Sequence, residues 1–366
     1  MSEPRQVSAS IATATAAVST DDDQPHVFEF LIVDDFLRTF VDARVLKTAF
    51  ELGLIDRLVE HRSGSADALG RMLGTDRQGM RFLLDLLGAN GVVEEARGDV
   101  RLTRRFQAAL RYRDLMETKL DYAGFTINDF ADLFTTLVQN GGGFMGKARL
   151  FELFDYRRCF ESTLENYVRT RAWMRITSTL TRYESQACLA VHDVSRHRRM
   201  LDVGGNSGEF VLQFCRRNPA LHATVYDLPL VCEIGLEHVM THPEHTRISF
   251  IKGDIRNEQL PASYDLISFK SMLHDWPAQD ARQFIDKAAR ALAPGGTLLI
   301  FERGALQVGN ATPPMSMLPN LLFFRSYRPA GDYVDQLNAL GFLDVSRHDI
   351  ELDSRYHLVT ARKPEG

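Results

Sequence analysis

The sequence predicts an α/β protein in which a doubly wound, mostly parallel sheet follows a mainly helical region. From about residue 199, short apolar runs alternate with helical patterns, as expected for parallel strands joined by crossover helices. In residues 27–190, apolar side chains recur at the three- and four-residue steps of helices. At 366 residues the chain is long enough for two or three domains.

Composition and charge exclude several classes of protein. Hydrophobic residues make up 45% and charged residues 25%, which predicts an ordered globular core. The net charge of −5 disfavours a nucleic-acid binder. Without a CxxC pair, the four cysteines are expected to be reduced thiols of a cytoplasmic protein. The chain lacks an apolar run of membrane-spanning length and an apolar signal region, so no membrane partner is expected.

Residues 1–24 and 25–110 are predicted to be a flexible tail and a helical domain, respectively. The tail is rich in alanine, serine and threonine and ends in three aspartates, 21–23. In residues 27–50 large apolar side chains occupy both faces of the predicted helix. A helix this apolar needs a cover beyond its own domain, so we expect a homodimer.

Within this domain, residues 65–103 predict a winged helix-turn-helix. Ser65 can cap a first helix that stops near Gly74, and Thr75 or Asp76 can cap a second one. Two short strands, 92–95 and 100–103, then flank a turn and form a hairpin.

The charges of the second of these helices argue against DNA binding. Arg77 and Arg81 are balanced there by Asp76 and Asp85, whereas a DNA-reading helix would be basic. We therefore expect the winged helix to serve dimerisation. A ligand-sensing winged-helix regulator is the alternative from another functional class.

Residues 111–190 are predicted to form a helical linker and part of a substrate pocket. The stretch from Phe151 to Tyr183 is crowded with aromatic and arginine residues, which suit either a pocket wall or a core with a basic outer face. The run Asn140–Gly143 contains three glycines and predicts a flexible or sharply turned loop.

Residues 191–366 are predicted to form the sheet. The expected strands are Met200–Val203, Thr224–Tyr226, Ile248–Ile251, Leu266–Phe269, Thr297–Phe301, Leu343–His348 and Tyr356–Ala361. The last two follow each other closely and are expected to pair as an antiparallel edge.

A glycine-rich turn follows the first of these strands. In residues 201–210, LDVGGNSGEF, the missing side chains of Gly204, Gly205 and Gly208 allow a ligand to lie on the backbone. The segment lacks the GxGxxG spacing of a dinucleotide binder and the GK[ST] of a P-loop, so both of those sites are disfavoured.

Polar residues also follow the next three strands. Asp227 can bind a ribose diol, Asp254 can accept the amine of an adenine, and His274 follows the fourth strand. Taken alone, each aspartate could be a helix cap and the histidine could be a residue of the core. Together they lie at the carboxyl ends of the strands, where such sheets bind ligands.

These motifs, with YDLP (226–229), GDI (253–255), KSMLHDW (270–276) and LAPGG (292–296), match a known family in order and spacing. The chain resembles class I S-adenosylmethionine (SAM)-dependent methyltransferases across residues 30–362. In particular, it resembles the small-molecule O-methyltransferases that carry an N-terminal winged-helix dimerisation domain. The resemblance implies a Rossmann-like catalytic domain, a homodimer, a small-molecule acceptor, and SAM that leaves as S-adenosylhomocysteine, with no metal.

The resemblance also implies residue roles. His274 would be the general base that takes the acceptor's proton, with Glu302 orienting it and Asp275 beside it. The residues that would hold SAM are Asp202, Gly204, Gly205, Gly208, Asp227, Leu228, Asp254, Ile255, Phe269 and Lys270. The residues expected to bind the acceptor are Met315, Asn320, Phe324, Arg325, Trp173 and Tyr167.

One departure from the family pattern leaves the acceptor atom open. Many members carry a second acid where this chain has Met315-Ser316-Met317, so His274 is expected to be less polarised. A thioether sulfur has no proton to lose. The alternative is therefore S-methylation of a small thioether carboxylic acid, such as the methylthio hydroxy acid precursor of dimethylsulfoniopropionate. Arg325, Arg328 or arginines of the 157–175 stretch would grip its carboxylate.

Overall fold

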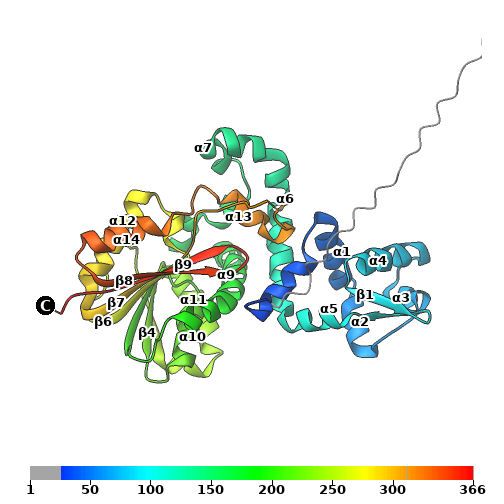
Figure 1. Ribbon diagram of the computed structural model, residues 1–366, viewed down its shortest axis with the longest axis horizontal. Coiled ribbons are helices and arrows are strands. Elements are labelled where there is room, and N and C mark those ends of the chain that lie inside the picture. The colour runs from blue at the N-terminus through cyan, green and yellow to red at the C-terminus, as the bar shows by residue number, and fades with distance from the viewer. Residues whose placement is uncertain (1–25, 311, 366) are drawn as a thin grey trace, which may run out of the picture.

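A computed structural model describes residues 26–310 and 312–365. The predicted tail, residues 1–24, lies outside the described residues. The rest forms two lobes, an N-terminal helical lobe and a larger lobe built on a central sheet (Figure 1). Across the described ranges, no helix has the length and hydropathy needed to cross a bilayer.

The N-terminal lobe has the predicted order of helix, helix and hairpin. Ser65 and Asp76 cap α3 and α4, and Gly74 ends α3 in the left-handed conformation, as expected from the sequence. The elements of this lobe are η1 (Glu29–Phe36), α1 (Phe40–Glu51), α2 (Leu54–His61), α3 (Ala66–Leu73), α4 (Arg77–Ala89), β1 (Val93–Ala96), β2 (Asp99–Leu102), α5 (Arg104–Ala109) and η2 (Leu110–Tyr112).

The arginines of α4 are paired with carboxylates. Arg77 lies 3.0 Å from Asp67, and Arg81 contacts both Asp85 and Glu95 within 3.0 Å. This pairing agrees with the expectation that α4 presents no basic face.

A long helix joins the lobes. Figure 1 shows α6 (Arg113–Gln139) leaving the N-terminal lobe and rising to α7 (Gly141–Met145). The predicted glycine loop is therefore wrong in part: the chain turns at Asn140, but the glycines start a short helix. The reason is a cap, since the Gly143 N–H donates to Asn140 Oδ1 at 3.0 Å. Three more segments follow: α8 (Leu150–Leu153), η3 (Tyr156–Phe160) and α9 (Leu164–Val191).

All seven strands predicted for the sheet are present, in the order β5-β4-β3-β6-β7-β9-β8. They are β3 (Arg199–Val203), β4 (His222–Asp227), β5 (Ile248–Lys252), β6 (Tyr264–Lys270), β7 (Leu292–Arg303), β8 (Leu343–Glu351) and β9 (Arg355–Arg362). Strands β3 to β7 are parallel. Strand β9 is antiparallel to both β7 and β8, which forms the expected edge.

Both faces of the sheet are buried, which explains its continuous apolar strands. On one face, Leu201 and Ile267 pack with residues of α12 and α14 such as Phe284. On the other, Met200 and Leu266 pack with α9 and α10. The connecting elements are α10 (Glu209–Arg217), α11 (Pro229–Met240), η4 (Pro243–Arg247), η5 (Leu273–Asp275), α12 (Ala278–Ala291), η6 (Met315–Met317), α13 (Leu318–Leu322) and α14 (Ala330–Ala339).

The topology fixes where a ligand can bind. The chain starts the sheet at β3, adds β4 and β5 on one side, and returns to add β6 on the other. Sheets of this kind bind ligands in the crevice at such a switch point, outside the carboxyl ends of the strands. Here the crevice lies between Val203 at the end of β3 and Lys270 at the end of β6.

Candidate active site

A large cavity opens at this switch point. Its empty volume is about 1500 Å³ including the open mouth, enough for a nucleoside-sized cofactor and a second small molecule. One side is formed by the turns after β3, β4 and β6, and the other by α6, α9 and α13. The cavity therefore has a sheet side and a helical side.

The glycine turn on the sheet side leaves no room for side chains. Gly204 has φ +69°, and a Cβ there would lie 2.5 Å from Met272 Cγ. A Cβ on Gly205 would lie 2.7 Å from Asp202 Oδ2. The turn is thus a bare backbone surface that a ligand can approach closely.

Two aspartates face this surface, Asp202 buried and Asp227 partly buried. Asp202 Oδ1 accepts from Ser268 at 2.5 Å, whereas its Oδ2 is buried without a hydrogen-bond partner. Burial raises the pKa of Asp202 to about 7. Asp227 accepts from the backbone N–H groups of Asn206 (2.8 Å) and Leu228 (2.7 Å), and burial raises its pKa to about 6. Such carboxylates gain strongly from a cationic or hydrogen-bonding ligand.

Two further charged groups of the sheet side are already paired. Asp254 holds Arg256 at 2.8 Å and Asn257 at 2.9 Å; burial alone would raise its pKa, but the Arg256 contact lowers it. Lys270 donates to Thr181 at 2.8 Å and pairs with Glu184. Both Asp254 and Lys270 line the cavity.

His274 lies at the junction of the two sides, between two carboxylates. Its Nδ1 is 2.6 Å from Glu302 Oε2, and its Nε2 is 3.5 Å from Asp275 Oδ1. The other oxygen of Glu302 accepts from the backbone N–H groups of Met272 (2.8 Å) and Leu273 (2.7 Å). Glu302, which is fully buried, thus fixes both the ring and the loop that carries it.

The two carboxylates control the charge of the histidine. Burial alone would lower the pKa of His274, but Glu302 and Asp275 outweigh it, and the pKa is raised. Asp275 is in turn held by the Tyr156 hydroxyl, which donates to its Oδ2 at 2.6 Å. An imidazole whose Nδ1 faces a carboxylate presents Nε2 as the proton acceptor.

Aromatic side chains form much of the helical side. The Tyr327 ring meets the His274 ring edge-on at 5.3 Å, and the Tyr156 ring stacks against Trp276 at 6.0 Å. Phe154, Trp173 and Phe323 complete this wall. The predicted residues Trp173 and Asn320 line it, and Asn320 Oδ1 lies 3.3 Å from the Tyr327 hydroxyl.

Two residues expected to bind the acceptor, Met315 and Tyr167, point away from the cavity. Each is held by a contact with another segment. Met315 packs against the N-terminal lobe, where its N–H donates to the carbonyl of Arg38, and Ser316 takes its place at the cavity. Tyr167 lies six residues before Trp173, on another face of α9, and donates to Glu237 at 2.6 Å.

Two more of the predicted acceptor residues, Phe324 and Arg325, do not line the cavity. Phe324 is 38% exposed, and its ring lies under the Arg325 guanidinium. Arg325 donates to the carbonyls of Leu137 and Val138. These carbonyls lie in the last turn of α6 and have no partner within the helix, so Arg325 caps its end.

Three other arginines considered for a carboxylate grip serve the backbone or the surface. Arg328 donates to the carbonyls of Leu273 (2.7 Å) and Trp276, so it holds the loop of His274. Arg158 donates to two backbone carbonyls, at residues 152 and 153, and Arg157 pairs with Asp155.

Of the other predicted residues, some line the cavity and the rest lie behind its surface. Those that line it are Asp202, Gly204, Gly205, Asp227, Leu228, Asp254, Ile255, Lys270, His274 and Asp275. Gly208, Phe269 and Glu302 lie behind this surface. Gly208 has φ +77°, and a Cβ there would lie 2.9 Å from Val239, so the glycine serves packing.

Several charged or hydroxyl-bearing residues of the cavity were missed from the sequence. They are Lys119, Tyr122, Glu184, Arg303 and Asp353. Lys119 carried a signal, since it falls within the apolar helical stripe that includes Met116, Leu120 and Ala123. In the structure Lys119 pairs with Asp34 and Asp353, and Arg303 pairs with Glu184.

Comparison with protein-family models gives two matches. Residues 133–342 match the O-methyltransferase domain, and residues 35–111 match the O-methyltransferase dimerisation domain. The first match covers more than half of the chain and includes His274, Glu302 and the glycine turn.

Individual relatives agree with these matches. The chain is 27% identical to acetylserotonin O-methyltransferase of Gallus gallus over 328 residues, covering 86% of this chain and 92% of that protein. It is 36% identical over 125 residues to 3-hydroxy-5-methyl-1-naphthoate 3-O-methyltransferase of Streptomyces sahachiroi, covering 34% and 35%. The crystal structure of human N-acetylserotonin methyltransferase in complex with SAM superposes with a TM-score of 0.68 at 22% identity, covering 88% and 94%.

Proposed function

The chain belongs to the O-methyltransferase family, and from this premise we propose that it methylates a hydroxyl group of a small aromatic molecule with His274 as general base. Membership makes it a SAM-dependent methyltransferase of small molecules. The hydroxyl acceptor and the role of His274 are the parts proposed. The observation that carries them is the His274–Glu302 contact of 2.6 Å at the cavity.

The sheet side fits SAM. The unpartnered Oδ2 of Asp202 suits the cofactor's ammonium group, and Asp227 suits its ribose diol. The glycine turn gives the backbone approach that the methionine part needs, and Asp254 and Ile255 would border the adenine. When bound, SAM supplies an electrophilic methyl group on a positively charged sulfur.

The residues around His274 supply the proton chemistry. Because Nδ1 faces Glu302, Nε2 is left to take the hydroxyl proton of the acceptor during attack. The imidazolium that results is stabilised by Glu302 on one side and Asp275 on the other. Asp275 thus supplies a second carboxylate in a chain that lacks an acid at 315–317.

The cavity wall favours a planar acceptor over a small aliphatic acid. Phe154, Trp173 and Phe323 offer flat apolar surface. Two cations near this wall, Lys119 of α6 and Arg303 at the end of β7, are already paired with carboxylates. Neither is therefore free to bind the carboxylate of a thioether acid, which disfavours S-methylation.

Methyl transfer from isotopically labelled SAM to a panel of acceptors tests the proposal. The panel contains phenols, aliphatic alcohols and thioether carboxylic acids, and mass spectrometry locates the label. We expect the label on a phenolic oxygen. Transfer only to a thioether sulfur would contradict O-methylation. SAM binding without transfer to any acceptor would favour the ligand-sensing alternative.

SAM binding is expected to weaken in mildly acidic solution. Asp202, with a pKa of about 7, and Asp227, with a pKa of about 6, must be charged to bind the cofactor. Their folded-state pKa values are raised, so affinity is full above pH 7 and falls as the pH drops through 7 and then 6. Between pH 8 and pH 5.5, the Kd should rise on the order of 10- to 100-fold.

Calorimetric titration of SAM across this pH range measures the effect. Asp202→Asn is the control. In this variant only Asp227 still titrates in this range, so the Kd for SAM should change less with pH than in the native protein. A Kd for the native protein that is constant from pH 8 to 5.5 would rule out this role for the two carboxylates.

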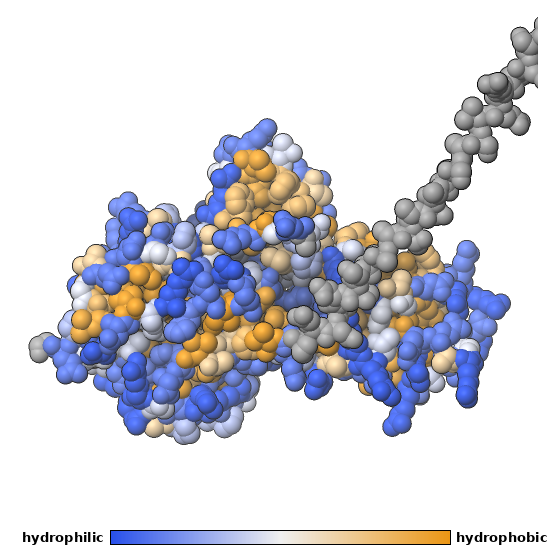
Figure 2. Space-filling view, viewed as in Figure 1, coloured by the Kyte–Doolittle hydropathy of each residue, from blue (hydrophilic) through white to orange (hydrophobic). Residues whose placement is uncertain are grey.

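A homodimer is the proposed assembly. The dimerisation-domain match covers residues 35–111, where Phe40 and Val41 are more than half exposed. Figure 2 shows further hydrophobic surface over the projecting end of α6 and α7, where Phe134, Val138 and Met145 are exposed. Light scattering at micromolar concentration should give twice the chain mass; a monomer mass would refute the dimer.

A further inference from the structure

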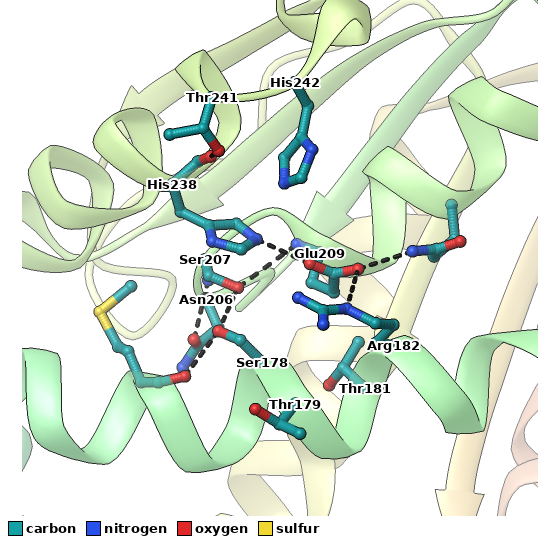
Figure 3. A network of polar contacts seen from close by, with 12 residues as sticks. Ser178, Thr179, Thr181, Arg182, Asn206, Ser207, Glu209, His238, Thr241 and His242 are labelled. Carbon is teal, nitrogen blue, oxygen red and sulfur yellow. Dashed lines mark hydrogen bonds and ion pairs between the residues drawn. The ribbon is translucent and has the colours of Figure 1, made fainter. Parts of the chain in front are cut away.

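A cluster outside the active-site cavity combines one carboxylate and two imidazoles: Glu209, His238 and His242 (Figure 3). Glu209 begins α10 directly after Gly208 of the glycine turn. His238 lies in the last turn of α11, and His242 follows the end of that helix. One donor atom from each of the three lies within 4.8 Å of the others.

The geometry is that of converging ligands. His238 and His242 are four residues apart, so their rings lie on the same side of the chain, with centroids 5.4 Å apart. Figure 3 shows both rings on one side of the Glu209 carboxylate and Arg182 on the other. Two histidines and one carboxylate, with a fourth position left for water, form a common donor set for Zn²⁺.

The burial and the contacts of these three side chains suit metal binding. Glu209 is only 1% exposed, and its Oε2 lies 2.7 Å from His238 Nε2, a contact that a metal ion would replace. The two histidines are partly exposed, which leaves an entry path from solvent.

Two arginines beside the cluster compete with a cation, and each has another carboxylate to pair with. Arg182 Nε lies 3.5 Å from Glu209 but also holds Asp114 at 2.9 Å. Arg216 donates to His242 Nδ1 at 3.0 Å.

Arg216 has a second partner within reach. It lies 3.5 Å from Glu244, whose Oε2 is buried without a hydrogen-bond partner. Turning toward Glu244 satisfies that oxygen and frees His242.

We propose that Glu209, His238 and His242 bind a divalent transition-metal ion, Zn²⁺ by their donor chemistry. Zn–N bonds are about 2.0–2.1 Å, so the 4.8 Å spread must close by side-chain rotation, which release of His242 by Arg216 permits. The ion would tie the end of α11 to the first turn of α10, next to the glycine turn. It takes no part in methyl transfer, so the proposal stands apart from the proposed function.

Titration of Zn²⁺ into the full chain, freed of metal by a chelator and of any histidine tag, tests the site. Calorimetry should show one saturable equivalent, and Co²⁺ in its place should give the absorption of a low-symmetry nitrogen–oxygen site. His238→Ala and His242→Ala should each weaken Zn²⁺ binding by at least about tenfold. His222→Ala removes an exposed histidine at the start of β4, outside the cluster, and should bind as the native chain does.

Arg216→Ala is the variant expected to raise the affinity for Zn²⁺. Removing the competitor for His242 should tighten Zn²⁺ binding; weaker binding would contradict the release of His242 by Arg216. Absence of a saturable equivalent in the native chain, or unchanged affinity in both His238→Ala and His242→Ala, would overturn the site. Metal-free thermal melts of each variant confirm that the chains compared are folded.

Discussion

His274→Ala will lower kcat by roughly 10²- to 10⁴-fold, the range that positioned general bases contribute. The only imidazole that lines the described part of the cavity is removed, and the acceptor hydroxyl must then lose its proton to water. The Glu302 carboxylate keeps its backbone bonds from Met272 and Leu273, so the loop should persist. Single-turnover kinetics with labelled SAM measures the chemical step directly.

Cofactor affinity separates a catalytic defect from a structural one. The Kd for SAM should change little in His274→Ala, because the groups proposed to hold SAM lie on the sheet side. An unchanged kcat would remove His274 from the mechanism and revive the thioether acceptor, which needs no base. Loss of both SAM binding and turnover would show that His274 serves structure.

Glu302→Gln will lower kcat by a similar factor, although only one oxygen becomes an amide nitrogen. The remaining oxygen can still accept from the Met272 and Leu273 N–H groups, which leaves the amide to face His274 Nδ1. An amide donates where the carboxylate accepted, so the proton of the ring moves to Nε2. The base then presents a donor to the acceptor hydroxyl and cannot take its proton.

The pH profile identifies this mechanism. In the native enzyme, kcat should rise with pH through the raised pKa of His274, since the neutral ring is the active form. In Glu302→Gln that pKa should fall, because one of the two carboxylates that raise it is gone. Asp349→Asn is a matched control, because Asp349 also contacts a histidine, His357, at 2.7 Å outside the cavity. A native kcat and profile in Glu302→Gln would contradict the orienting role.

The sequence predicted the sheet because its signals are local and strong. Apolar runs such as 297–301 are typical of central strands buried on both faces, and both faces are buried. Ser65 and Asp76 marked helix starts because a side-chain oxygen caps free N–H groups regardless of the tertiary structure. The cavity residues at the strand ends followed from the topology, since parallel strands bring their carboxyl ends to one edge.

Residues outside the strands were harder to place, because their direction depends on contacts with distant segments. Backbone bonds from η6 to residues 37 and 38 turn Met315 toward the N-terminal lobe and Ser316 toward the cavity. Arg325 caps a helix that ends almost 190 positions earlier in the chain. Neither partner is visible in the local sequence.

The pairing of Lys119 with Asp34 and Asp353 has a consequence for how new specificities arise. It fastens α6, the first segment of the N-terminal lobe and the turn between β8 and β9 into one frame around the helical side of the cavity. On the proposed site, the groups that would hold SAM lie on the sheet side, whereas the acceptor would also contact residues that this frame positions. On this proposal, a chimera that exchanges only the sheet lobe is expected to keep SAM binding and to change its choice of acceptor.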